Sequence, residues 1–394
     1  SGSSATAERT MSVTYSSLTP ETVVDYVNQW NPDLAADSAV EISDGNLNLV
    51  FRVSTAGNSG SVIVKQAVPY LRVAGEGWPL TMDRSRIEAE ALALHGSLAP
   101  GLTPTLHHRD DDMHVLVLED LAHHRVWRGA LIDGEHVPGA AIGVGRYCAQ
   151  TLLGASDLLM NPAERKMLIS RFVNPELCAI TEDLVFTAPY IDAESNNIDD
   201  AAIEMAAQLR ADRALQQAAA RLRFMFMTRA ETVIHGDLHT GSIMVASNDP
   251  RVMDPEFAFF GPMAFDLGNV LANFAFARVR HELLGNEDFA QQVDNYATEF
   301  WSSFSEEVSR LWPSNEPWRR PFLQALLVDS AGFAAMEMIR RMVGLAHVRD
   351  IDDLPLEHRY LARTRIHQGA RMLALGLPVS SLKDLWSRAI GKES

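Results

Sequence analysis

Three carboxylic acids within residues 233–262 have a spacing that could support chemistry. Asp237 follows the apolar pair Val-Ile and the dipeptide His-Gly, whereas Asp254 and Glu256 follow a second apolar pair, Val-Met, and are separated by one proline. Carboxylates brought close together repel one another unless a cation lies among them, and Mg²⁺ with a nucleotide supplies that charge. Phosphoryl transfer needs positioning, charge neutralisation and an acceptor for the hydroxyl proton. We therefore interpret Asp237 as the proton acceptor and Asp254 and Glu256 as metal ligands.

A predicted hairpin brings these acids together. Residues 243–245 and 251–253 are short apolar runs, and the tetrapeptide between them, Ser-Asn-Asp-Pro, is rich in turn-forming residues. Because a hairpin places its two outer ends side by side, the loop before the first strand should adjoin the loop after the second. We expect Asp237 and Asp254 to be spatial neighbours.

Strand patterns dominate the first third of the chain. A helix is predicted over residues 20–31, with Thr19 as its N-cap. Residues 40–53 contain an Asp-Gly dipeptide between two apolar runs, which is a strong hairpin signal. Residues 104–121 have the same pattern of strand, turn and strand, so two hairpins are expected.

Lys65 is a charged residue in an apolar strand, predicted over residues 61–67. A lysine is costly inside an apolar sheet unless an anionic group meets it. A solvent-facing lysine at a strand end would give the same pattern, but the position downstream of the Asp-Gly turn favours a nucleotide phosphate. Glu88 or Glu90, on a helix predicted over residues 84–98, could pair with it.

The pattern becomes helical after a polar connector. Apolar residues recur at three- and four-residue spacing over the segments 138–161, 164–170, 199–229, 264–280, 287–310 and 320–348. We predict an α+β fold with two lobes: a small β-rich N-terminal lobe (residues 11–118), a hinge (119–123), and a larger, mainly helical C-terminal lobe (124–394).

Composition limits the possible partners and the compartment. The 394 residues carry a formal net charge of −17, which argues against nucleic acid or an acidic membrane surface as a partner but leaves room for a local cationic pocket. Cys148 and Cys178 are expected to be buried free thiols, which fits a reducing cytoplasm. No apolar run approaches the roughly 18 residues of a membrane span, and residues 1–10 lack the apolar core of a signal peptide.

Several motifs carry a resemblance to known enzymes. The run His-Gly-Asp-Leu-His-Thr-Gly-Ser-Ile at residues 235–243 resembles the catalytic loop of the aminoglycoside-phosphotransferase and protein-kinase-like superfamily, and within it most closely that of the 5-methylthioribose kinase family. The other motifs that mark this family are Asp254-Pro255-Glu256-Phe257-Ala258-Phe259 with Gly261-Pro262, Gly75-x-Gly77-Trp78-Pro79, and Arg340-Arg341 ahead of Gly344-Leu345-Ala346-His347. The resemblance covers residues 20–375.

The resemblance implies a two-lobed protein-kinase-like fold and an ATP-dependent kinase. Such an enzyme would phosphorylate the anomeric hydroxyl of 5-methylthioribose in methionine salvage, as a cytoplasmic homodimer that needs Mg²⁺. Asp237 would be the catalytic base, Arg340 and Arg341 would reach the sugar and the transferring phosphate, and Asp254 and Glu256 would hold the metal. The implied nucleotide-binding residues are the phosphate loop Asp44, Gly45, Asn46 and Asn48, the phosphate ligand Lys65 with its partner Glu88, and the hinge residues Glu119 and Leu121.

One position departs from the superfamily pattern. Ser242 stands where most members carry a metal-binding asparagine, and since a serine hydroxyl is a shorter and weaker ligand, we expect Glu256 to bind the second metal instead. Asp266 resembles a residue that braces the catalytic loop by hydrogen bonds.

Two alternatives remain open. The first is a kinase of the same fold acting on another small acceptor, such as 5-deoxyribose, an aminoglycoside or an amino alcohol. The paired arginines argue against an aminoglycoside, because a polycation needs an acidic pocket. The second is an inactive nucleotide-binding module, which would lack the lysine, the base or a metal position; all three are present in this sequence.

Overall fold

The computed structural model describes residues 15–42, 47–58, 60–71, 75–376 and 379–392. Two compact units make up the chain, and each has a hydrophobic core of its own. The N-terminal unit comprises the chain up to Ala89 together with Thr105–Asp120, and the helical unit comprises Glu90–Pro104 and Leu121–Ser394.

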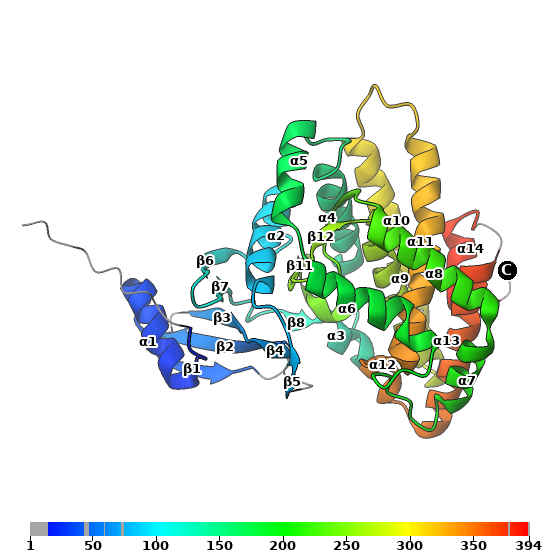
Figure 1. Cartoon of the computed structure of the whole chain (residues 1–394), viewed down its shortest axis with the longest axis horizontal. Helices are drawn as coiled ribbons and strands as arrows, with labels where there is room; N and C mark the ends of the chain where they lie inside the picture. Colours follow the sequence, from blue (N-terminus) through cyan, green and yellow to red (C-terminus); the bar gives the residue numbers. More distant parts are fainter. Residues whose placement is uncertain (1–14, 43–46, 59, 72–74, 377–378, 393–394) are drawn as a thin grey trace, which may run out of the picture. The chain divides into compact units, whose positions relative to one another are not determined.

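An antiparallel five-stranded sheet forms the centre of the N-terminal unit (Figure 1). The strand order is β1–β2–β3–β7–β6, with bounds β1 Ala36–Glu41, β2 Asn48–Thr55, β3 Ser61–Ala67, β6 Leu106–Asp110 and β7 Val115–Glu119. The remaining elements are α1 (Pro20–Trp30), the short pair β4 (Tyr70–Leu71) and β5 (Gly75–Pro79), α2 (Arg84–Leu98), which runs on into the helical unit, and 3₁₀ turns at Pro32–Leu34 and Ala56–Asn58. Both predicted hairpins are confirmed, as β1–β2 and β6–β7.

One face of this sheet packs against α1 to form the smaller core. Its almost completely buried side chains are Val23, Val27, Phe51, Val53, Val64, Val115 and Val117. The predicted cap of α1 is also confirmed: the Thr19 side chain accepts the Thr22 N–H, and the Thr22 side chain accepts the Thr19 N–H. This capping box satisfies two backbone donors at the helix start.

Two small β-sheets lie among the helices in the described part of the helical unit (Figure 1). Its helices are α3 Trp127–Asp133, α4 Ala140–Gly154, α5 Pro162–Arg171, α6 Pro175–Phe186, α7 Ile203–Ala211, α8 Arg213–Thr228, α9 Met263–Leu283, α10 Glu287–Leu311, α11 Arg319–Val343, α12 Arg349–Asp352, α13 Leu356–Leu375 and α14 Leu382–Ala389, with 3₁₀ turns at Ala188–Tyr190 and Thr240–Ser242. Its strands are β8 Arg125–Val126, β9 Thr232–Ile234, β10 Ile243–Ala246, β11 Asp249–Val252 and β12 Phe259–Gly261. The strand orders of the two sheets are β11–β10–β8 and β12–β9.

Helix α9 lies at the centre of the helical unit and packs along both α10 and α11. It approaches α11 closely at Gly268, where an added Cβ would lie 2.7 Å from the Ser330 carbonyl oxygen and 2.8 Å from the Ala334 nitrogen. Both helices carry charged residues of the candidate site, so this contact helps to fix their relative positions.

Helix α11 is long and apolar enough to cross a membrane by length and composition alone. However, 67% of the apolar window in it is buried inside the protein, and it packs against α9 and α13. This is the burial expected for the core helix of a folded domain.

The predicted helices agree with the structure except in three places. The segment predicted over 320–348 ends at Val343. The segment predicted over 199–229 is two helices, because Asp212 accepts the Leu215 N–H and caps α8 at that point. The segment predicted over 138–161 ends at Gly154 and continues as turns. Helices α3, α6, α12, α13 and α14 have no counterpart among the predicted segments.

The two cysteines are free thiols, as predicted. Cys148 is buried, but Cys178 is only partly buried, which corrects the expectation for that residue. Burial raises the pKa of both thiols, that of Cys178 to about 12, so neither is a ready nucleophile at neutral pH.

The Gly268 contact predicts a specific loss of stability. In Gly268→Ala the new methyl group would collide with backbone atoms of α11, which cannot rotate away, so the free energy of unfolding should fall by about 1–3 kcal/mol although alanine favours helix. Urea unfolding followed by circular dichroism measures this difference. Gly60→Ala, where the nearest atom would be 3.8 Å away, should be close to neutral; equal stability of both variants would contradict the close approach.

Candidate active site

The loop that contains Asp237 is joined to the loop after β11 by backbone contacts. Strand β9 pairs with β12, and β10 pairs with β11 in the predicted hairpin. Gly236 has a φ of +83°, and a Cβ added to it would meet the carbonyl of Phe257, with the carbonyl carbon only 2.7 Å away. Only glycine fits this conformation and this close approach. The loop that contains Asp237 therefore adjoins the loop after β11, as expected from the predicted hairpin.

Asp266, near the start of α9, holds the backbone of the first loop. Its carboxylate accepts the N–H of His235 at 2.7 Å and the N–H of Gly236 at 3.0 Å. Burial raises the pKa of Asp266 to about 7 against the effect of these two donors. The bracing suggested by the sequence is therefore present in the structure.

His235 connects the two loops through its ring. Its Nε2 lies 2.8 Å from the Met253 carbonyl oxygen, and its Nδ1 accepts the Asp237 N–H at 3.3 Å. Burial lowers the pKa of His235 to about 4, although the Met253 carbonyl and the charges of Asp237 and Asp254 oppose this shift. The ring is therefore neutral at physiological pH and donates from Nε2.

Two guanidinium groups and one imidazole ring surround the Asp237 carboxylate. Oδ1 lies 3.0 Å from Arg340 Nη2 and 3.8 Å from Arg341 Nη2, and Oδ2 lies 3.4 Å from His239 Nε2. Burial acts to raise the pKa of Asp237, but His239 and the two guanidiniums outweigh it and hold that pKa well below its usual range. Asp237 is thus a carboxylate, and the two arginines predicted for the site meet it directly.

His239 presents one defined tautomer to Asp237. Its Nδ1 accepts the Gly241 N–H at 2.9 Å, so Nε2 carries the proton and donates toward the carboxylate. Burial lowers the pKa of His239 against the opposing effect of Asp237. Sequence reasoning assigned no role to this histidine, although its place two residues after Asp237 is a usable signal.

Two further charged residues of the site were missed by the sequence analysis. Glu337, on α11, bonds to both Arg340 and Arg341; the signal for it is a single acid inside an apolar helical run. Arg128, on α3, donates to Asp350 at 2.6 Å and to Asn273 at 2.7 Å. No local pattern could have paired Arg128 with an aspartate 222 positions away.

The predicted metal residues follow β11. Asp254 adopts a φ of +62°, which is uncommon for a residue other than glycine, and Glu256 is buried, with its carbonyl oxygen accepting the Asn174 amide at 3.0 Å. Among the residues that the structure describes, no group of three or more His, Cys, Asp or Glu side chains is arranged to hold a metal ion.

Ser242 has a structural task in the loop. Its hydroxyl lies 3.0 Å from the Asp237 carbonyl oxygen and 2.9 Å from the His239 carbonyl oxygen, and it accepts the His239 N–H at 3.1 Å. The hydroxyl therefore closes the turn after Asp237. The weaker metal affinity expected for a serine at this position stays a prediction.

In the N-terminal unit, Lys65 forms the pair that the sequence suggested. Its Nζ lies 2.9 Å from the Glu88 carboxylate, and both side chains are more than nine-tenths buried. Glu90, the alternative partner, contacts Arg171 instead.

Three other residues predicted to bind the nucleotide form hydrogen bonds within the protein. The Asn48 side-chain oxygen accepts from Arg84 at 3.0 Å. At the predicted hinge, the Glu119 N–H donates to the Thr105 carbonyl at 2.9 Å, and the Leu121 carbonyl accepts the His124 N–H. Asp44, Gly45 and Asn46 lie outside the described residues.

Comparison with known proteins identifies the family. The phosphotransferase enzyme family matches residues 38–301. The chain is 40% identical over 391 residues to the methylthioribose kinase of Yersinia enterocolitica, covering 95% of this chain and 98% of that protein. It is 41% identical over 384 residues to the methylthioribose kinase of Pectobacterium atrosepticum, covering 92% and 95%. The chain belongs to the methylthioribose kinase family.

A solved structure supports the fold independently. A spectinomycin phosphotransferase in complex with ADP and spectinomycin has a TM-score of 0.51, covering 94% of this chain and 100% of that one at 10% identity. At this identity the likeness concerns the fold alone. It confirms the predicted α+β kinase-like fold, with a sheet in the N-terminal part and a mainly helical remainder.

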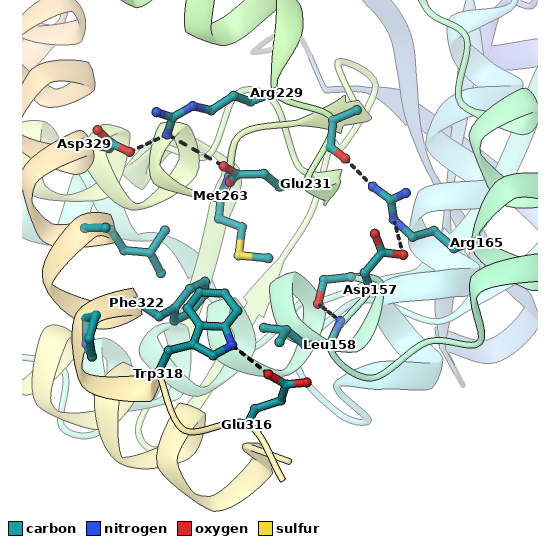
Figure 2. A pocket seen from close by; sticks show the side chains of 15 residues that line it. Asp157, Leu158, Arg165, Arg229, Glu231, Met263, Glu316, Trp318, Phe322 and Asp329 are labelled. Carbon is teal, nitrogen blue, oxygen red and sulfur yellow. Dashed lines mark hydrogen bonds and ion pairs between the residues drawn. The ribbon is translucent and has the colours of Figure 1, made fainter. Parts of the chain in front are cut away.

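A cavity of about 750 Å³ lies in the helical unit at the opposite end of α11 from Arg340 (Figure 2). Its apolar lining includes Leu158, Met263, Pro321, Phe322, Ala325 and Leu326. Figure 2 shows that its charged groups pair with one another: Arg229 lies 2.5 Å from Asp329, and Arg165 lies 3.3 Å from Asp157.

The buried carboxyl of Asp266 predicts a pH dependence of stability. Its folded pKa of about 7 exceeds the unfolded value, so the folded state binds more protons between about pH 4 and 7, and this contribution is lost as the pH rises through 7. Relative to Asp266→Asn, the wild type should lose about 2–3 kcal/mol of unfolding free energy between pH 5 and pH 8. Urea titrations of both proteins at the two pH values test this; a constant difference would contradict the raised pKa.

Proposed function

We propose that this chain transfers the γ-phosphoryl group of ATP to the anomeric hydroxyl of 5-methylthioribose, giving 5-methylthioribose 1-phosphate and ADP. The observation that carries the proposal is the contact of the Asp237 carboxylate with Arg340 and Arg341, in a chain whose relatives are named methylthioribose kinase. A base beside two guanidiniums can accept a hydroxyl proton while cations meet a transferring phosphoryl group.

The acceptor chemistry suits a weak base. An anomeric hydroxyl is more acidic than an ordinary alcohol, so a carboxylate such as Asp237 can take its proton. The arginines disfavour a polycationic acceptor, because like charges would meet in the pocket. A neutral sugar is compatible with both features, whereas an aminoglycoside is not.

We assign the metal to Asp254 and Glu256. Mg²⁺ is usually held by one or two carboxylates, with phosphate oxygens and water completing its octahedron, and two carboxylates after β11 are a donor set of that kind. When bound, the ion would neutralise charge on the nucleotide phosphates. Ser242 is left out of this set because its hydroxyl bonds within the loop.

We assign three sets of residues to the binding of the nucleotide. Lys65, held by Glu88, would bind phosphate oxygens; residues Asp44–Asn48 would cover the phosphates; and the backbone of Glu119 and Leu121 would meet adenine. These assignments rest on the family resemblance and on the buried Lys65–Glu88 pair. In the same way we propose lobes at residues 11–118 and 124–394 with a hinge at 119–123, a homodimer, and a cytoplasmic role in methionine salvage.

Loss of the base gives the first test of this proposal. Asp237→Asn keeps the size of the side chain but cannot accept the proton, so we expect turnover to fall roughly 10²–10⁴-fold with ATP binding intact. Coupled ADP detection and calorimetric titration of ATP measure the two quantities. Asp249→Asn, a more exposed aspartate paired with Arg251, serves as control, and unchanged turnover in Asp237→Asn would refute the assignment.

Removal of one metal ligand gives a second test. Glu256→Gln keeps the shape but loses a charge, so the Mg²⁺ concentration at half-maximal activity should rise by about 10-fold or more. Binding of Mn²⁺ followed by electron paramagnetic resonance should weaken in parallel. Glu164→Gln, at an exposed position on α5, should change neither quantity; equal metal affinity in Glu256→Gln would remove this residue from the metal site.

An acceptor panel decides between the proposed substrate and the alternatives. We expect phosphorylation of 5-methylthioribose and none of kanamycin or choline under the same coupled assay. Phosphorylation of kanamycin without methylthioribose activity would overturn the proposed acceptor while leaving the kinase assignment in place.

A further inference from the structure

Arg340 and Arg341 share one buried carboxylate, that of Glu337. Glu337 Oε1 accepts from Arg341 Nε at 2.8 Å, and Oε2 accepts from Arg340 Nε. The Nη2 atoms of the same two arginines point to Asp237 Oδ1, at 3.0 and 3.8 Å. Each guanidinium therefore bridges Glu337 on one side and Asp237 on the other.

Helix geometry explains why this position gathers both arginines. Consecutive residues on an α-helix point about 100° apart, so Arg340 and Arg341 would not meet the same point without a common partner. Glu337 precedes them by three and four positions, and these are the spacings at which helical side chains are neighbours. Its side chain is only 1% exposed, so both bonds are shielded from bulk solvent.

The four groups also balance in charge. Two guanidiniums and the carboxylates of Glu337 and Asp237 sum to zero. Burial acts to raise the pKa of Glu337, but the two arginines outweigh it and lower that pKa to about 2, so Glu337 is charged at any working pH. Without it, two cations would face a single carboxylate, that of Asp237.

We propose that Glu337 is a positioning residue for phosphoryl transfer: its carboxylate holds the Arg340 and Arg341 guanidiniums in place, so that they can meet the acceptor and the transferring group while Asp237 remains available as the base. This inference rests on the proposed function. Glu337 is buried beneath the arginines, touches neither acceptor nor nucleotide in this assignment, and acts through the arginines alone.

Other charged groups near the quartet of Asp237, Glu337, Arg340 and Arg341 do not replace Glu337. His239 faces the other carboxylate oxygen of Asp237, Asp266 bonds to the loop backbone, and Arg128 is held by Asp350 and Asn273. Among the described contacts, only Glu337 accepts from both Nε atoms.

Glu337→Gln is the main test. A glutamine offers one acceptor oxygen, and its NH₂ group would face the second guanidinium. One arginine would therefore lose the hydrogen bond that holds its guanidinium. We expect kcat for methylthioribose to fall by about 10²-fold and the KM for the sugar to rise several-fold, with the KM for ATP unchanged. Glu337→Asp, which keeps the charge on a shorter side chain, should recover part of kcat.

The matched control is Glu307→Gln on α10. Glu307 is also mostly buried and pairs with an arginine three positions later, Arg310, but lies in a different helix. Glu307→Gln should leave both KM values and kcat near those of the wild type.

A double-mutant cycle tests whether Glu337 and Arg341 act as a unit. Arg341→Met should lower kcat much less in the Glu337→Gln background than in the wild type, because the two residues depend on each other.

Two kinetic outcomes would overturn the proposal: wild-type kinetics in folded Glu337→Gln, or a kcat loss that only follows the unfolded fraction, with no change in the sugar KM. A crystal structure of Glu337→Gln tests the positioning without any substrate. Displacement of one guanidinium by more than about 1 Å is expected, and unmoved guanidiniums would refute it. Inactive wild type on methylthioribose would instead refute the proposed function, and the crystallographic result would still decide the role of Glu337.

Discussion

The candidate site depends on one buried carboxylate that does no chemistry itself. Asp266 accepts two backbone N–H groups at the turn into the catalytic loop, and these donors would otherwise lie unpaired in the interior, at a cost of about 1–3 kcal/mol each. Gly236 then adopts a positive φ and lies close to the Phe257 carbonyl. The next residue, Asp237, lies beside the two arginines of α11. Helix α9 carries Asp266 and contacts α11 at Gly268. The positions of the catalytic loop and of the two arginines are therefore fixed by the same pair of helices.

Local sequence was sufficient to predict much of this arrangement. Thr19 as a cap, the β10–β11 hairpin, and a carboxylate partner for Lys65 all follow from short-range patterns: a capping residue, a turn-rich tetrapeptide, and a lysine that an apolar strand tolerates only with a counter-ion. Each involves residues close in sequence or a strong local cost. The choice of Glu88 over Glu90 came from the family resemblance. The division of the 199–229 segment at Asp212 was missed because the apolar period continues on both sides of the cap.

The remaining parts of the site could not be predicted, for a physical reason. Arg128 and Asp350 are brought together only by the packing of α3 and α12 beside α9, and packing is decided by the whole core. Glu337 is different, since its spacing from Arg340 and Arg341 was visible. A helix period alone does not reveal that the shared face points inward, and an acid three residues before an arginine is more often a solvated pair.

The balance of charge offers a reason for coupling proton transfer to phosphoryl transfer. The chain carries a net charge of −17, but screening over about 8 Å at physiological salt makes nearby groups decisive. The quartet around Asp237 is neutral as long as that carboxylate is charged. If Asp237 is the base, its protonation leaves the quartet with one net positive charge, held by Arg340 and Arg341 next to the group that then needs it. The stabilising field would therefore appear as the acceptor oxygen becomes nucleophilic, and no guanidinium would have to move to create it.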